Sequence, residues 1–179
     1  MASFEEYVAV AQSKNNSRTI GIYPETKNPE FFNSILAERD HNTTMEDILL
    51  EALKKHGYSG PSSPCFVQSF FPSSLEYIAT KSSLPLVYLT STSLPNSTLE
   101  KYAKFCYGVG PSKNAIVQVI DQRVFKKTDF LDRAHAYGLK VSCLRFWRVM
   151  IFALASKCCI YNTQGFDEAF KTNYSPSYR

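Results

Sequence analysis

The chain has 179 residues, of which 44% are hydrophobic, 20% charged and 14% aromatic. A domain usually takes roughly 100–200 residues, so this length predicts one domain with a sizeable core. The composition excludes collagen-like, low-complexity and wholly disordered chains. The net charge of +4 comes from scattered basic residues and not from a basic stripe, so we expect no direct binding of nucleic acid.

The sequence contains neither a signal-peptide pattern nor a spanning segment. Its first six residues include two acids and no apolar stretch, and the most apolar run, 146–161, is interrupted by Arg148 and Lys157. Five irregularly spaced cysteines predict buried thiols, not a disulfide scaffold or a metal site. We expect a soluble chain, although four glycosylation sequons leave a secreted form open; they start at Asn15, Asn42, Asn96 and Asn173.

Short apolar runs alternate with amphipathic segments in the first part of the chain. Thr19–Tyr23 is β-branched and aromatic and ends at a proline, which is typical of a strand. A helix is predicted after Asn28, because Pro29 suits the first helical position. The capping-box pattern Thr43–Glu46 predicts a second helix, which ends at Gly57.

The middle of the chain continues this alternation. Cys65–Phe70 is nearly all apolar, as in a parallel strand covered on both faces. Further capping-box patterns at Ser73–Glu76 and Ser97–Glu100 predict two helices, and Leu86–Thr90 predicts the strand between them.

The last predicted elements are shorter. Tyr107–Gly110 is compatible with a short strand, and residues 116–120 are ambiguous between strand and loop. Thr128 is expected to cap a helix that ends near Gly138, and Lys140–Phe146 is the last clear strand. Strands alternating with helices at this spacing predict βαβ units and a mainly parallel sheet, so the fold class is α/β.

One local pattern carries chemistry. Glu25 and Lys27 are two residues apart, just past the carboxyl end of the first predicted strand, where the active sites of α/β barrels lie. On an extended chain both side chains point the same way. The carboxylate could bind a hard cation and the lysine a phosphate. The alternative is an exposed ion pair without function.

The three histidines offer no such pattern. His41 lies in a polar loop, His56 at a helix end and His135 within a predicted helix. None belongs to a metal-binding or nucleophile motif, and the sequence has no glycine-rich phosphate loop.

Four segments resemble, in order, the motifs of glycerophosphodiester phosphodiesterases of the eukaryotic, plant-like type. Arg18–Pro29 is similar to GIYPEIKxP, Phe66–Leu75 to iQSFxPxSL, Tyr107–Lys113 to GIGPxK, and Thr128–Val141 to TDLVxRAHAxGLxV. This resemblance implies a partial (β/α)8 TIM barrel of the phospholipase-C-like phosphodiesterase type, without the first strands and the last strand. It divides the chain into an N-terminal segment 1–17, a barrel domain 18–146 and a divergent tail 147–179.

The resemblance also implies an activity, a cofactor and site residues. Such enzymes hydrolyse glycerophosphodiesters to glycerol 3-phosphate and an alcohol in lipid metabolism, and they use a divalent cation such as Mg²⁺ or Ca²⁺. Glu25 matches the metal-ligating glutamate of the family and Lys27 the lysine that approaches the phosphate. Gln68 and Phe70 match a strand whose end borders the substrate pocket.

Other family features are absent from the sequence. The His-Arg-Gly-Ala strand, the further acidic ligands and both catalytic histidines have no counterpart, so no catalytic residue is assigned. We therefore expect an incomplete barrel with little activity alone and with open sheet edges that favour self-association. The alternative is a non-catalytic phosphate-binding pseudoenzyme or interaction module.

Overall fold

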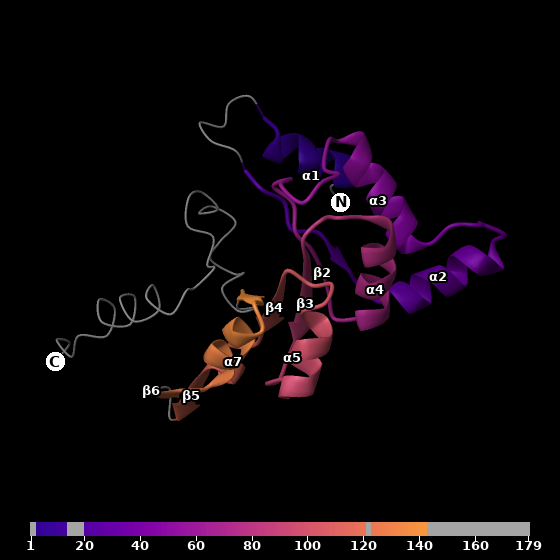
Figure 1. Cartoon of the computed structure of the whole chain (residues 1–179). Coiled ribbons are helices and arrows are strands. Elements are labelled where there is room, and N and C mark those ends of the chain that lie inside the picture. Colours follow the sequence, from indigo (N-terminus) through magenta and orange to yellow (C-terminus); the bar gives the residue numbers. More distant parts are fainter. Residues whose placement is uncertain (1–2, 14–19, 121–122, 143–179) are drawn as a thin grey trace.

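A computed structural model describes residues 3–13, 20–120 and 123–142, and a five-stranded parallel sheet forms its centre (Figure 1). The strands lie in the order β1-β2-β3-β4-β7, and each neighbouring pair is parallel. Their bounds are Glu25–Thr26 (β1), Val67–Ser69 (β2), Leu86–Thr90 (β3), Gly108–Pro111 (β4) and Lys140–Val141 (β7). The predicted α/β class with a parallel sheet is confirmed.

Seven helices and a separate antiparallel strand pair accompany the sheet in the described ranges. In Figure 1, helices α2, α3 and α4 line the right side of the strands, and the β5–β6 pair projects at the lower left beyond α7. The helices are α1 (Phe4–Ala11), α2 (Pro29–Glu38), α3 (Met45–Lys55), α4 (Pro72–Lys81), α5 (Asn96–Tyr102), α6 (Lys113–Ile116) and α7 (Phe130–Ala136), and the strand pair is β5 (Val117–Ile120) and β6 (Arg123–Lys127).

The first strand differs from its prediction. Ile22 makes only an isolated bridge to Cys65, and the paired strand β1 is Glu25–Thr26, beyond the proline that was expected to end it. Pairing continues across Pro24 because proline lacks an N–H but keeps its carbonyl, which accepts a bond of 2.9 Å from the Gln68 backbone N–H. Glu25 therefore lies within a strand and not past its end. Thr19 lies outside the described residues.

The predicted helices are present, but their first residues differ. The helix predicted from Thr43–Glu46 is capped by Thr44, whose hydroxyl accepts from the Asp47 N–H at 3.1 Å. Helix α4 begins at Pro72 and not at the Ser73 pattern. Helix α5 follows Pro95 as its cap and not Ser97. The patterns were wrong about the caps of α4 and α5 because proline, with its fixed φ, sets the start of α4 and the last residue before α5.

The later elements resolve the ambiguous region. Residues 116–120 contain the end of α6 and all of β5. The cap of α7 is Asp129, because the Thr128 hydroxyl donates to the carbonyls of Ala115 and Ile116 at 2.6 and 3.1 Å. Strand β7 covers the start of the predicted last strand, whose residues 143–146 lie outside the described part.

The two faces of the sheet have different surroundings. Thr26 and Ser69 are fully buried on the face toward α4, where the Thr26 hydroxyl lies 3.0 Å from that of Ser74. The main apolar core lies on this side and includes Val67, Leu86 and the α4 residues Leu75 and Ile78. Because side chains alternate along a strand, Glu25 and Gln68 face the other way.

The described part of the chain shows an open sheet, with β1 and β7 each paired on one side only. The domain division stays a prediction, since the tail 147–179 and part of the segment 1–17 lie outside the described residues. So do Asn15, Asn173 and the cysteines at 143, 158 and 159. No helix within the described ranges has the length and apolar character to cross a membrane.

Close contact between β4 and β7 requires a glycine. A Cβ added at Gly108 would lie 2.5 Å from the backbone oxygen of Lys140. We expect Gly108→Ala to lower the free energy of unfolding in urea by about 1–3 kcal/mol, because the two strands must separate. Gly60→Ala is the control, since an added Cβ there meets nothing within 4 Å, and a similar loss in both variants would contradict the explanation.

Candidate functional site

The register of β1 and β2 brings two of the predicted site residues together. Glu25 pairs with Gln68 in the parallel ladder, and Thr26 pairs with Ser69. Adjacent strands lie about 4.8 Å apart, and residues in register point to the same face. The side chains of Glu25 and Gln68 therefore lie side by side at the carboxyl edge of the sheet, opposite the α4-covered face.

Lys27 completes a charged group at this edge. Its Nζ lies 3.9 Å from Oε2 of Glu25, which confirms that the two side chains reach toward each other. The Lys27 side chain is 74% exposed and that of Glu25 only 20%. An ion pair this long and this open to water contributes little to stability. The ammonium group of Lys27 is thus accessible to a ligand in solution.

The surroundings of Glu25 disfavour a bare negative charge. Desolvation at this position raises the pKa of Glu25, and the positive charge of Lys27 opposes that shift only in part. A carboxylate that has lost much of its hydration is stabilised by a second cation beside it. Glu25 is therefore suited chemically to bind a positively charged group.

Gln68 is the most enclosed of the four predicted residues, with 1% of its surface exposed. Its Nε2 donates to the backbone carbonyl of Tyr23 at 3.3 Å. Its Oε1 is buried and finds no hydrogen-bond partner among the described residues. Phe70 follows β2 and is 42% exposed, so it offers an apolar surface at the same end of the strand.

The oxygen atoms present fit part of a hard-cation site. Carboxylate and amide oxygens are ligands that Mg²⁺ and Ca²⁺ prefer. Glu25 supplies the first, and the buried Oε1 of Gln68 supplies an amide oxygen that lacks a partner in this part of the chain. Within the described ranges, however, no three His, Cys, Asp or Glu side chains cluster to hold a metal.

The histidines lie elsewhere in the fold. His56 is the C-cap of α3 and His135 lies within α7, so both are on helices and not at strand ends. His41 is exposed in the loop between α2 and α3. The structure places them as the sequence predicts, with no histidine in the β1–β2 ladder.

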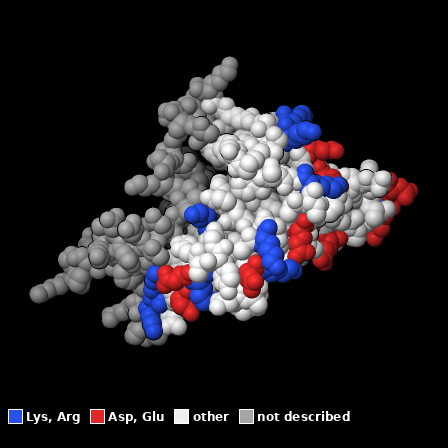
Figure 2. All heavy atoms as spheres, viewed as in Figure 1, with Lys and Arg blue, Asp and Glu red and all other residues white. Residues whose placement is uncertain are grey.

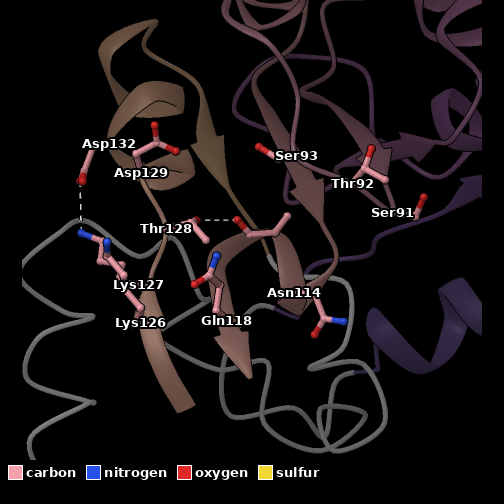
Figure 3. Close-up of a pocket in the computed structure, with 11 residues that line it drawn as sticks. Ser91, Thr92, Ser93, Asn114, Gln118, Lys126, Lys127, Thr128, Asp129 and Asp132 are labelled. Carbon is pink, nitrogen blue, oxygen red and sulfur yellow. Dashed lines mark hydrogen bonds and ion pairs between the residues drawn. The ribbon is translucent and has the colours of Figure 1, made fainter. Parts of the chain in front are cut away.

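The structure also contains a hollow away from the β1–β2 edge, which was not predicted from the sequence. It has a volume of about 910 Å³ and opens where the loop after β3 meets α6, the β5–β6 pair and the start of α7 (Figure 3). Three of its four charged side chains are paired: Lys127 lies 3.2 Å from Asp132, and Asp129 lies 3.2 Å from Arg133. No motif marks it, since its lining comes from four separate elements. The lining includes Ser91, Thr92, Ser93, Asn114, Gln118 and Lys126.

Charged side chains of both signs are interspersed over the face seen in Figure 2. Opposite charges also pair directly, as in Lys101–Glu76 at 2.8 Å. A nucleic-acid binder usually concentrates basic residues on one face. The expectation of no nucleic-acid partner stays a prediction.

The chain is similar in sequence to a plant phosphodiesterase. No family model matches the chain. The chain is 35% identical over 160 residues to glycerophosphodiester phosphodiesterase GDPD6 of Arabidopsis thaliana. The family resemblance is confirmed over this segment. The match covers 78% of this chain but 42% of the relative, so the chain spans less than half of that phosphodiesterase's length.

The similarity to a glycerophosphodiester phosphodiesterase gives the β1–β2 edge its context. The roles assigned to Glu25, Lys27, Gln68 and Phe70 stay predictions. The fold brings these residues to one edge of the sheet.

Desolvation of Glu25 predicts a measurable pH effect on stability. The folded state has the raised pKa, so the carboxyl group favours folding less as pH rises through that pKa. In a metal chelator at pH 7, Glu25→Gln should therefore unfold at a higher temperature than the wild type. Below about pH 4 the difference should vanish, because Glu25 is protonated in both states.

Calorimetry or circular dichroism during heating measures both midpoints. Glu30→Gln is the matched control, because Glu30 is an exposed carboxylate in the first turn of α2. A stabilisation by Glu25→Gln that persisted unchanged at pH 3 would contradict desolvation as its cause.

Proposed function

We propose that this chain forms part of a cation-dependent glycerophosphodiester phosphodiesterase site. The observation that carries the proposal is the placement of Glu25, Lys27 and Gln68 at the carboxyl edge of a parallel sheet, in a chain 35% identical to such an enzyme. The substrates are glycerophosphodiesters, and the products are glycerol 3-phosphate and an alcohol.

The residues divide the work by charge and polarity. Glu25 holds the divalent cation, Mg²⁺ or Ca²⁺, through its desolvated carboxylate. Once bound, such a cation stabilises negative charge on phosphoryl oxygens. Lys27 contacts the substrate phosphate with its exposed ammonium group, and Gln68 and Phe70 border the substrate.

The sheet itself is proposed to be part of a (β/α)8 barrel. Its five strands are all parallel and follow chain order across the sheet, as consecutive barrel strands do. The candidate site lies at their carboxyl edge, where barrel enzymes carry their active sites. Unpaired edges at β1 and β7 within the described ranges support self-association as a further proposal.

Turnover by this chain alone is proposed to be low. The described residues provide one carboxylate at the edge and no histidine beside it, whereas general acid–base catalysis contributes typically about 10²–10⁴-fold. A second candidate function follows, a non-catalytic module that binds phosphate. The 74% exposure of the Lys27 side chain favours it, because an accessible ammonium group suffices for binding.

Release of glycerol 3-phosphate from glycerophosphocholine tests the activity. With Mg²⁺ or Ca²⁺ added, we expect the purified chain to remain near the background rate, because the described edge provides one carboxylate and no histidine. Robust hydrolysis that Glu25→Ala abolishes would overturn the low-turnover proposal and would assign the activity to this chain.

Binding of glycerol 3-phosphate separates the two candidate functions from an inert chain. Calorimetric titration in the presence of Ca²⁺ should give a binding signal that Lys27→Ala weakens about tenfold or more, the effect expected when one charge-assisted contact is lost. Lys104→Ala is the control, since Lys104 is an exposed lysine that follows α5. Absence of binding by the wild type would refute both functions.

A further inference from the structure

The unpaired carbonyl oxygen of Gln68 is the least satisfied atom of the candidate site. Oε1 is buried, and it lacks a hydrogen-bond partner within the part of the chain that the structure describes. Leaving a buried polar group unpaired is unfavourable, because the group has lost its hydration without gaining a hydrogen bond. Gln68 is only 1% exposed, so bulk water does not satisfy the atom either.

The orientation of the amide is fixed by its other end. The nitrogen donates to the Tyr23 carbonyl at 3.3 Å, and that carbonyl accepts hydrogen bonds and cannot donate them. Turning the amide over would place two oxygens against each other. Oε1 is therefore the atom that is left for another ligand.

The neighbour in register decides what that ligand is. Gln68 pairs with Glu25 across the β1–β2 ladder, so the free oxygen and the carboxylate lie on one face of adjacent strands. Two oxygen acceptors at this spacing do not bond to each other, and both require a positive or donor group. The Lys27 ammonium group lies 3.9 Å from Glu25, too far for a good hydrogen bond.

We infer that the side-chain carbonyl of Gln68 is the second protein oxygen that binds the divalent cation at Glu25. This inference rests on the proposed function, since it concerns the same cation. A neutral amide oxygen adds a ligand for a hard cation without adding a second negative charge to a desolvated position. The hydrogen bond to Tyr23 holds the amide in place, so the oxygen is already oriented before the cation arrives.

Calorimetric titration of the full chain with CaCl₂ and with MgCl₂, without substrate, tests this role. Gln68→Met keeps the side-chain length and removes the oxygen, and we expect it to weaken cation affinity about tenfold or more. Gln118→Met is the control, because Gln118 is an exposed glutamine in β5.

The outcomes separate the inference from the function beneath it. Loss of affinity in Gln68→Met together with its retention in Gln118→Met supports the inference. Binding that Glu25→Gln abolishes but Gln68→Met leaves unchanged overturns the inference and keeps the proposed cation site. The inference and the proposed cation site are both overturned if the wild-type chain binds neither Ca²⁺ nor Mg²⁺. They are also both overturned if Glu25→Gln leaves the affinity for the cations unchanged.

A spectroscopic readout covers the case in which Gln68→Met fails to fold. In ¹⁵N-labelled wild type, the side-chain NH₂ resonances of Gln68 should shift on addition of CaCl₂, since coordination through oxygen polarises the whole amide. The corresponding resonances of Gln118 should stay in place, and Glu25→Gln should remove the Gln68 shift. A Gln68 signal unmoved at cation saturation would overturn the inference.

Discussion

The pairing of β1 with β2 across Pro24 is the constraint on which the candidate site depends. The Pro24 carbonyl accepts from the Gln68 N–H at 2.9 Å, and this bond fixes the register that places Glu25 opposite Gln68. A slip of one residue would turn every side chain to the other face. Glu25 would then face α4, and Thr26 would take its place at the candidate site.

The helical face of the sheet stabilises that register. Thr26 lies 3.0 Å from Ser74 of α4, and the Ser69 hydroxyl donates to the Thr26 carbonyl at 3.0 Å. These buried polar contacts have partners, whereas the opposite face keeps a half-buried carboxylate and an unpaired amide oxygen. The half-buried carboxylate and the unpaired amide oxygen thus lie on the same face of the sheet, where a ligand would meet them.

Sequence reasoning predicted much of the fold, because each signal was local. The strand Leu86–Thr90 has its predicted bounds, and the glycines at 57 and 138, both with positive φ, end helices as expected. The predicted caps of α4 and α5 were wrong because adjacent prolines, and not the Ser and Glu residues of the pattern, set where these helices begin. The predicted end of the first strand was wrong because a proline has no N–H to donate, but its carbonyl oxygen still accepts a hydrogen bond from the neighbouring strand.

By itself, the sequence determined the α/β alternation, the family resemblance and the carboxylate and ammonium two residues apart, since all three are written in neighbouring residues. The tertiary structure decided which residues face one another. It set Gln68 beside Glu25, which lies 43 positions earlier in the sequence, and left the Gln68 amide oxygen unpaired among the described residues. Strand register and burial depend on residues far apart in the sequence. Local sequence patterns therefore carry no information about which atoms the folded chain leaves without a hydrogen-bond partner.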